Sequence, residues 1–395
     1  ITANGGQSYS TPNIDKLARN GMRFTQSQAS PLCSPARFTI LTGKYNFRNY
    51  TNWGVMNPNE KTLGNLFQSA GYKTCATGKW QLDGSDASVK SLGFDKYCLW
   101  NAYEIYSSGS QGSSYKNPTI YQDGGYLPSS ETDGKYGEDI YTKYVTDFID
   151  SNKRNNFFVY YAPPSVHTPF GPTPDDPEFA TWDPRNRISD PKFFPSMVSY
   201  VDKKVGEIVA KVKSLGLSDK TMIIFTGDNG TPTEIYSMFN GQLVQGGKSS
   251  TNTWGTHVPL MIAGAGIPKS TVNNNLISFT DFMMTFQEMT GADVSTYDTL
   301  DGVSFYKQLF QQPSKPRAYI YDYYHPLTNS GNNSLRMWVQ DPTYRLYGLT
   351  DKFYNMATDP YEKTKIKRGA MTTQEKEVYQ NFKDILARYP DYPTP

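Results

Sequence analysis

The first two thirds of the chain alternate short apolar segments with longer amphipathic ones. The short segments are bounded by turn residues and lie at residues 23–28, 72–77, 157–161, 222–225 and 258–263. Segments of this length and character are typical of strands buried in a sheet. We therefore predict that each of them forms a strand.

Helices are predicted between these strands. Residues 11–21 begin with a capping threonine and a first-turn proline and end at a glycine, which is a typical helix outline. Residues 34–43, 62–70 and 195–215 carry similar patterns, and we expect Ser34 to be the N-cap of the helix that it begins. Strands that alternate with helices indicate an α/β fold, whose mostly parallel central sheet has helices on both faces.

The pattern changes after residue 310. Residues 335–347 and 352–356 are short alternating segments, and residues 373–388 form one amphipathic stretch. These features predict a small antiparallel sheet with a helix. We expect two parts, an α/β catalytic domain at residues 1–310 and a C-terminal subdomain at residues 311–395.

Composition excludes several kinds of partner. Lysine plus arginine (39) nearly balances aspartate plus glutamate (37), so the chain lacks the basic field that nucleic-acid binding requires. No apolar run is long enough to span a membrane. The chain has only 3 histidines, which favours a metal site of oxygen ligands around a hard cation over a zinc site built from several imidazoles.

The cysteines are too few for a disulfide framework. They are Cys33, Cys75 and Cys98, so at most one pair could form. If Cys33 serves chemistry, Cys75 and Cys98 either bond to each other or remain buried free thiols.

Polar residues follow the predicted strands. Cys33, Lys79, His167 and the segment 227–230 each follow an extended apolar segment. Because ligand sites in open α/β sheets gather at the carboxyl ends of strands, we expect these residues to share one pocket.

The segment CSPAR at residues 33–37, followed by LTG at residues 41–43, resembles the signature of the sulfatase family. The resemblance implies that Cys33 is oxidised to formylglycine, whose hydrate is the nucleophile, and that Arg37 holds the hydrate. A helix N-terminus suits an anionic ester because it offers unpaired N–H groups and a positive dipole. Taken alone, the pattern would also fit a structural thiol and an arginine on a solvent-facing helix.

The segment GYKTCATGKWQL at residues 71–82 resembles the second signature of the same family. The resemblance implies that Lys79 contacts the sulfate and the leaving oxygen. The family usually has histidine where this chain has Gln81, and glutamine cannot carry a proton at neutral pH. We therefore assign Gln81 to substrate binding and not to base catalysis.

Two further segments imply an acid and a metal site. PPSVHTPF at residues 163–170 resembles the part of the family that protonates the leaving group, which makes His167 the candidate acid. Asp228 and Asn229 follow an apolar strand, as the family's metal ligands do, although Asp-Asn-Gly is also a common turn. With Cys33 they would bind Ca²⁺, with Mg²⁺ as the alternative.

A later signature resembles residues 246–248 and 255–260. It implies that Lys248 reaches the sulfate. His257 either lines the substrate pocket or caps the strand that follows it.

One family feature has no counterpart. The family carries a strand that ends in paired aspartates upstream of the segment matched by residues 3–6, and these aspartates complete the metal shell. We expect the native protein to have this segment ahead of Ile1, because a central sheet without it would expose strand edges.

The resemblance as a whole implies a sulfatase that hydrolyses sulfate monoesters, with a sulfated carbohydrate as the expected substrate. A formylglycine-generating enzyme would act on it during maturation, and we expect an exported protein, either periplasmic, extracellular or lysosomal. One alternative is a phosphonate or phosphate ester hydrolase of the same superfamily. Another is a catalytically silent carbohydrate-binding relative, which the absent aspartates, Gln81 and a tyrosine-rich insertion at residues 103–137 would favour.

Overall fold

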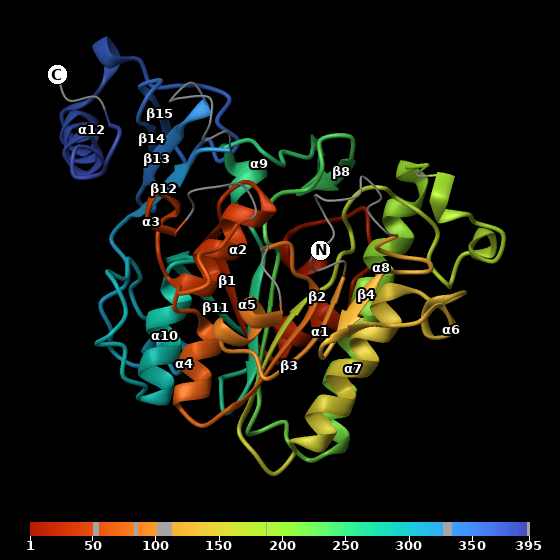
Figure 1. Cartoon of the computed structure of the whole chain (residues 1–395). Helices are drawn as coiled ribbons and strands as arrows, with labels where there is room; N and C mark the ends of the chain where they lie inside the picture. The colour runs from red at the N-terminus through yellow and green to blue at the C-terminus, as the bar shows by residue number, and fades with distance from the viewer. Residues whose placement is uncertain (50–54, 83–85, 101–112, 187, 327–333, 393–395) are drawn as a thin grey trace.

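The computed structural model describes residues 1–49, 55–82, 86–100, 113–186, 188–326 and 334–392 (Figure 1). Strands occupy the centre of the larger part of the molecule and helices lie outside them. A smaller sheet and a helix near the C-terminus form a separate lobe. This arrangement confirms the predicted α/β fold with a C-terminal antiparallel subdomain, while a domain boundary at residue 310 stays a prediction.

The central strands form two groups. The first has the order β11–β1–β10–β7, with bounds Thr271–Ser278, Gly21–Gln28, Leu260–Gly264 and Met222–Thr226. The second has the order β5–β4–β3–β2–β6, with bounds Gly125–Tyr126, Ile120–Gln122, Lys96–Trp100, Lys73–Lys79 and Phe157–Ala162. A separate hairpin joins β8 (Tyr236–Phe239) to β9 (Gln242–Gln245).

The central strands pair in a mixed way, with as much antiparallel as parallel pairing among the described residues, so the mostly parallel pairing that the sequence predicted was wrong. Strand β1 is parallel to β11, and β2 is parallel to both β3 and β6. Strand β10 runs antiparallel to β1 and β7, and β4 runs antiparallel to β3 and β5. The antiparallel β4 and β5 belong to the insertion at residues 103–137, of which residues 103–112 lie outside the described residues.

Helices cover both faces of the sheet (Figure 1). On one face α1 (Pro12–Arg19) and α7 (Gly137–Ser151) pack against α8 (Phe194–Ser214). On the other face α2 (Cys33–Thr42), α4 (Leu63–Ser69) and α10 (Asp281–Thr290) pack against one another. The shorter helices are α3 (Asn46–Asn49), α5 (Asp86–Ser91), α6 (Ser129–Thr132), α9 (Thr253–Thr256) and α11 (Tyr306–Leu309).

Local sequence explains where the helices begin. Thr62 caps α4 in a reciprocal capping box with Asn65. In α1, the backbone N–H groups of Asn13 and Ile14 donate to the buried Asp202 of α8, which replaces a side-chain cap from Thr11.

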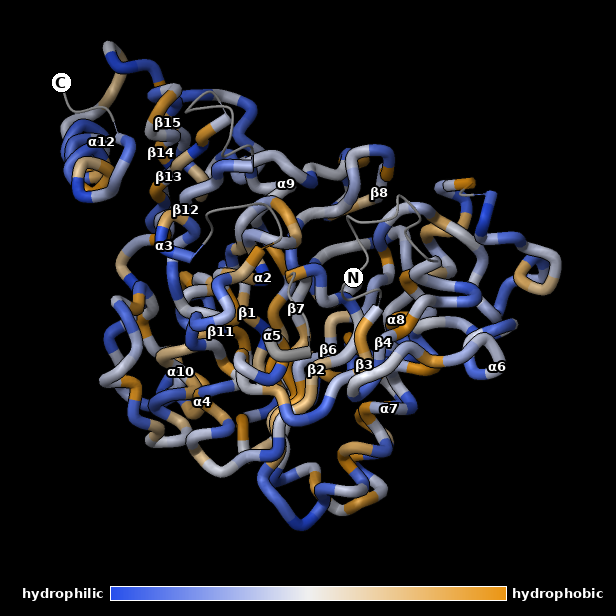
Figure 2. Tube along the Cα trace, viewed as in Figure 1, coloured by the Kyte–Doolittle hydropathy of each residue, from blue (hydrophilic) through white to orange (hydrophobic). Residues whose placement is uncertain are grey.

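The C-terminal lobe is an antiparallel sheet of β12 (Ile320–Tyr324), β13 (Arg336–Gln340), β14 (Tyr344–Tyr347) and β15 (Lys352–Asn355), in that order. Helix α12 (Thr373–Leu386) packs on this sheet through a stripe of buried residues, Tyr379, Phe382, Ile385 and Leu386. Apolar positions concentrate along the central strands and the inner sides of the helices, whereas connecting loops are mostly polar (Figure 2). The three cysteines are free and buried, so Cys75 and Cys98 do not form a disulfide.

Candidate active site

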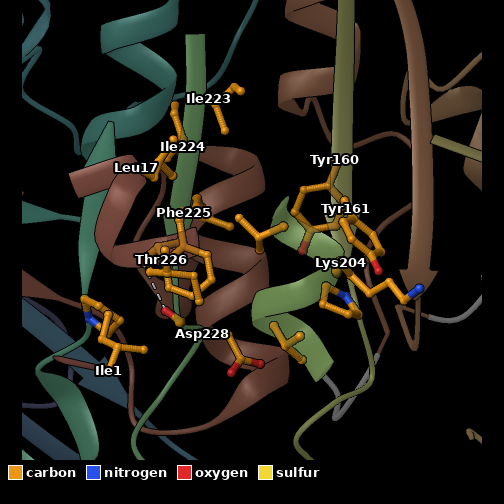
Figure 3. A pocket seen from close by; sticks show the side chains of 18 of the residues that line it. Ile1, Leu17, Tyr160, Tyr161, Lys204, Ile223, Ile224, Phe225, Thr226 and Asp228 are labelled. Atoms are coloured by element: carbon orange, nitrogen blue, oxygen red, sulfur yellow. Dashed lines mark hydrogen bonds between the residues drawn. The ribbon is translucent and has the colours of Figure 1, made fainter. Parts of the chain in front are cut away.

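A large cavity separates the two groups of strands. Its volume is about 1160 Å³, and every residue of β6 and β7 lines it. Figure 3 shows side chains of both strands beside this cavity, with Asp228 just beyond the end of β7. Within the described residues β6 pairs only with β2 and β7 only with β10, so each strand has one edge without a strand partner. We call this cavity the β6–β7 cleft.

The walls of the β6–β7 cleft are apolar. Val205 and Ile208 of α8 and Leu17 of α1 line it from one face, and Phe67 of α4 and Phe286 of α10 line it from the other. All residues of β6 and β7 remain partly exposed, which is unusual for strands at the centre of a sheet. The cleft therefore has the form of a slot for one more strand.

Both strands end at the same end of the cleft. The loop with His167 follows β6, and Asp228 follows β7. Arg37, Lys79 and Lys248 line the cavity together with these two residues. Asn229 and His257 also line it, so seven of the predicted site residues share one cavity, whereas Cys33 and Gln81 are not among its lining residues.

Cys33 is the first residue of α2 and is 8% exposed. Leu32, not the predicted Ser34, is the N-cap, because the extended Leu32 accepts the Ala36 N–H with its carbonyl oxygen. No side chain caps this end of the helix. The first-turn N–H groups are therefore open to an anion beside the Cys33 side chain.

Arg37 lies one turn further along α2 and is buried. Its Nη1 donates to the carbonyl oxygens of Lys79, at 3.2 Å, and of Trp80. Its Nε and Nη2 are also buried and have no hydrogen-bond partner among the described residues. A buried guanidinium with unused donors favours a bound anion at this place.

Lys79 is the last residue of β2, and its carbonyl oxygen accepts the hydrogen bond from Arg37. Gly78 before it has φ +86°, and a Cβ there would lie 2.1 Å from the Ala162 carbonyl oxygen, so only glycine allows β2 and β6 to approach here. Gln81 is half-buried with φ 45° and does not belong to the cavity lining.

The charges around Cys33 act on its thiol. Burial alone would raise the pKa of Cys33, but the positive charges of Lys79, Arg37 and Lys248 outweigh both burial and the Asp228 carboxylate and lower it. Burial lowers the pKa of Lys79, and Arg37 and Lys248 add to this effect. Among the described residues the site is thus a cluster of three cations beside one carboxylate, that of Asp228.

His167 lies in the loop after β6. Its Nδ1 is 2.7 Å from the Thr168 carbonyl oxygen, so Nδ1 carries the hydrogen and Nε2 is left for a ligand. Burial, with the charges of Lys79 and Lys248, lowers the pKa of His167 to about 4. An anion bound to the two lysines would offset these charges and raise the pKa of His167 again.

Asp228 and Asn229 line the cleft and offer it a carboxylate and an amide oxygen. The Asn229 Nδ2 donates to the Gly230 carbonyl oxygen at 2.8 Å, whereas its Oδ1 is buried without a partner in the described part of the chain. A carboxylate and an orphaned amide oxygen fit a hard cation. Among the described residues no three His, Cys, Asp or Glu side chains could hold a metal together, so this pair supplies only part of a coordination shell.

Lys248 reaches the cavity through a tight turn. A Cβ on Gly247 would lie 2.5 Å from the Cβ of Trp254, so only glycine lets this turn pack against α9. The next residue, Ser249, donates its N–H to the Pro31 carbonyl oxygen at 2.8 Å, which ties the turn to the start of α2.

His257 lies where α9 ends and borders the cavity. Its Nε2 is 2.9 Å from the Thr25 carbonyl oxygen of β1. Burial lowers its pKa. The ring thus contacts the sheet and also borders the cavity, so the role of His257 stays a prediction.

Comparison with known proteins decides the family. The sulfatase family model matches residues 1–292, which is most of the chain. The chain belongs to the sulfatase family. Its relatives include N-acetylgalactosamine-6-sulfatase of Mus musculus, 29% identical over 81% of this chain, and arylsulfatase A of Homo sapiens, 28% identical over 81%. The chain spans only 65% and 66% of the length of these two sulfatases.

Solved structures show the same fold. BT4656, in complex with its substrate D-glucosamine-2-N,6-O-disulfate, has a TM-score of 0.77 and 20% identity and covers 99% of this sulfatase chain and 96% of its own. The phosphonate monoester hydrolase of Agrobacterium radiobacter has a TM-score of 0.70 and 18% identity, with coverages of 98% and 92%. At such identities the likeness concerns the fold alone.

Two residues that no sequence motif indicated contact the His167 loop. Glu138 and Tyr115 are buried and form hydrogen bonds with Ser165 and Pro164 of this loop. Glu138 lies in the first turn of α7, where an acidic residue is common because it stabilises the helix dipole. Tyr115 is one of 30 tyrosines in the chain, so its residue type does not distinguish it. Neither position carries a local signal of function.

Proposed function

We propose that this sulfatase hydrolyses sulfate monoesters of carbohydrates through a formylglycine derived from Cys33. The observation that carries the proposal is the cation cluster around Cys33. Arg37, Lys79 and Lys248 lie near one another and near the uncapped start of α2, where a sulfate group would balance their charge.

The cations have separate roles in this proposal. Lys79 and Lys248 bind the sulfate oxygens and offset the negative charge that grows on the transferring group. The free Nε and Nη2 of Arg37 hold the oxygens at position 33. Because α2 and the ends of β2 and β6 fix these groups, they need little rearrangement to meet the substrate.

His167 would protonate the departing alcohol oxygen from Nε2. The hydrogen bond of Nδ1 to Thr168 leaves Nε2 directed to the substrate, and the bound sulfate supplies the negative charge that favours the imidazolium. Gln81 cannot remove a proton in the later release of sulfate, so its proposed role stays in substrate binding.

The modified residue and the metal would supply the remaining chemistry. A hydrated aldehyde at position 33 offers a hydroxyl nucleophile and a second hydroxyl that allows sulfate to leave, and a divalent cation lowers the pKa of the nucleophile. Asp228, Asn229 and position 33 would hold the cation, with Ca²⁺ as the proposed metal and Mg²⁺ as the alternative.

Among the described residues Asp228 and Asn229 supply only part of a coordination shell. Further oxygen ligands would have to join them at this end of the β6–β7 cleft to reach the six to eight that Ca²⁺ takes.

The substrate class follows from the relatives. N-acetylgalactosamine-6-sulfatase acts by name on a sulfated amino sugar, and BT4656 binds one in its complex. We propose a sulfated carbohydrate for this chain also, together with maturation by a formylglycine-generating enzyme and export. None of the helices in the described part of the chain has the length and apolar character needed to cross a bilayer.

Mass spectrometry across Cys33 in natively matured protein tests the nucleophile. We expect the mass change of a thiol converted to an aldehyde, and we expect Cys33→Ala to lower turnover by more than about a thousandfold, as the loss of nucleophiles does in other hydrolases. An unmodified thiol in active protein would overturn the proposed mechanism.

Matched aryl sulfate and aryl phosphate esters test the reaction. Faster initial rates on the sulfate support a sulfatase, and faster rates on the phosphate or phosphonate would assign the alternative hydrolase. Glycan binding without any turnover by modified, metal-loaded protein would instead indicate a silent carbohydrate-binding relative.

A further inference from the structure

The loop that carries His167 rests on a buried carboxylate. Glu138 is fully buried near the start of α7. Its Oε1 accepts hydrogen bonds from the backbone N–H of Ser165, at 2.9 Å, and from the Ser165 hydroxyl, at 2.6 Å. Glu138 therefore fixes both the backbone and the side chain of a residue two positions before His167.

A tyrosine holds the same loop from its other side. The Tyr115 hydroxyl donates to the carbonyl oxygens of Pro164, at 3.2 Å, and of His167. The His167 N–H in turn donates to the Pro164 carbonyl oxygen at 3.0 Å. The backbone of the candidate acid is thus bonded directly to Tyr115 and, through Ser165, to Glu138.

A carboxylate is a poor choice for stability at this position. Glu138 Oε2 is buried without a hydrogen-bond partner in the described part of the chain. Its charged neighbour is Asp139, also an acid, and the remaining groups that face it are the phenols of Tyr115, Tyr136, Tyr141 and Tyr161. Because no cation among the described residues compensates it, an amide side chain, which keeps an acceptor for Ser165, would fold at least as well, and the carboxyl calls for a functional reason.

We propose that Glu138 and Tyr115 are positioning residues that hold the His167 loop so that Nε2 meets the leaving oxygen. This inference rests on the proposed sulfatase function and adds two residues to it. Both act through His167 and neither lines the β6–β7 cleft, so they affect the protonation of the leaving group and not the binding of sulfate.

Two substrates with different leaving groups distinguish a role in positioning His167 from a general role in stability. An alkyl or sugar sulfate needs its oxygen protonated as the bond breaks, whereas 4-nitrophenyl sulfate leaves as a stable anion. We expect Glu138→Leu and Tyr115→Phe to lower kcat on a sugar sulfate by roughly 10- to 100-fold and on 4-nitrophenyl sulfate by less than about threefold. KM should change little on either substrate.

The conservative variant and a remote control complete the test. Glu138→Gln keeps an oxygen acceptor for Ser165 and should restore most of the activity on the sugar sulfate. Asp202→Asn alters another buried carboxylate that accepts backbone N–H groups, but at the start of α1, and should leave the ratio of the two rates unchanged.

Each outcome has one meaning. Equal losses on both substrates in folded Glu138→Leu protein would overturn the positioning role while the proposed function stands. If the unaltered protein, modified at Cys33 and supplied with Ca²⁺, turns over neither sulfate, the proposed function itself fails.

Discussion

We call a boundary between two packed groups of elements a seam, and two seams in this molecule differ in how completely side chains fill them: the β6–β7 cleft, and the boundary between the central sheet and the C-terminal lobe. The seam between β6 and β7 is open, with partly exposed residues along both strands and a cavity of about 1160 Å³. The seam between the central sheet and the C-terminal lobe is closed, since Trp338 and Arg345 on it are completely buried. The open seam is therefore a local feature and not a sign of loose packing throughout the chain.

The closed seam is held by polar groups as well as apolar ones. Arg345 Nη1 donates to Glu362 at 2.9 Å, and its guanidinium lies 4.3 Å from the centre of the Trp338 ring. Glu362 also accepts the Thr253 N–H at 2.8 Å, at the start of α9. Through this contact the C-terminal lobe supports the helix on which the Lys248 turn packs.

The contrast shows what the open seam lacks. Its walls are regular strands and helices with apolar side chains on both faces, so an extended apolar segment would fit it without a rearrangement of the walls. Because the cleft ends at Asp228 and His167, a strand that fills it would also finish the site.

Filling the cleft should produce the largest effect. We expect an apolar extension of about six residues ahead of Ile1 to raise the free energy of unfolding by on the order of 5 kcal/mol, because the buried side chains and two paired edges outweigh the cost of ordering the strand. Denaturant unfolding measures this gain. A hydrophobic dye that binds the open cleft should be displaced in parallel.

A glycine-serine extension of equal length is the matched control and should change neither quantity. Two aspartates placed at the end of the apolar extension should make the thermal midpoint depend on Ca²⁺. Equal dye binding with and without the apolar extension would show that the cleft does not accept a strand.

Breaking the closed seam should have the next largest effect. Arg345→Met removes the partner of buried Glu362, and we expect a loss of about 3–5 kcal/mol in the free energy of unfolding. The double variant Arg345→Met/Glu362→Gln should recover part of this loss, because no uncompensated charge remains. Equal stability of the single and double variants would show that packing of Arg345 on Trp338, and not its charge, holds this seam.

Two paired isoleucines allow the packing of a buried position and of a cleft position to be compared within one sheet. Ile262 of β10 and Ile224 of β7 are direct partners, but Ile262 is 0% exposed whereas Ile224 lines the cleft. We expect Ile262→Ala to cost about 3 kcal/mol and Ile224→Ala about 1 kcal/mol, since only the first empties a packed position. Equal losses in urea unfolding would mean that the cleft is closed in solution.

Sequence patterns predicted the strands and helices that border both seams, but not that one seam is open and the other closed. The strand ends predicted that Lys79, His167 and Asp228 share one pocket, because parallel strands carry their ends to a common edge, and all three line the cavity. Arg37 and Lys248, which the family resemblance indicated, line it as well. The antiparallel place of β10 between β1 and β7 depends on contacts between distant segments, which no local pattern records.

Side chains that act through long-range contacts also escaped prediction. Glu138, Tyr115 and Arg345 have partners 27, 49 and 17 residues away along the chain, and each looks ordinary in its local sequence. The N-cap of α2 was misplaced by two residues for the opposite reason, since Ser34 has good capping chemistry but the extended Leu32 precedes the helix.

The smallest effect concerns the pH dependence of stability at Glu138. Burial raises the pKa of Glu138 to about 7, above its ordinary value of 4.5. The folded state therefore holds this proton more tightly than the unfolded state, so its contribution to stability is full below about pH 4.5 and is lost as the pH rises to 7. Glu138→Gln cannot ionise, and its stability relative to the unaltered protein should rise by about 2–3 kcal/mol between pH 5 and pH 8. Thermal unfolding of both proteins across this range measures the difference. A difference in stability that does not change with pH would mean that Glu138 has the same pKa in the folded and the unfolded state. That result would require water or a cation at Oε2. It would also remove the argument that the Glu138 carboxylate lowers the stability of the fold and is therefore present for function.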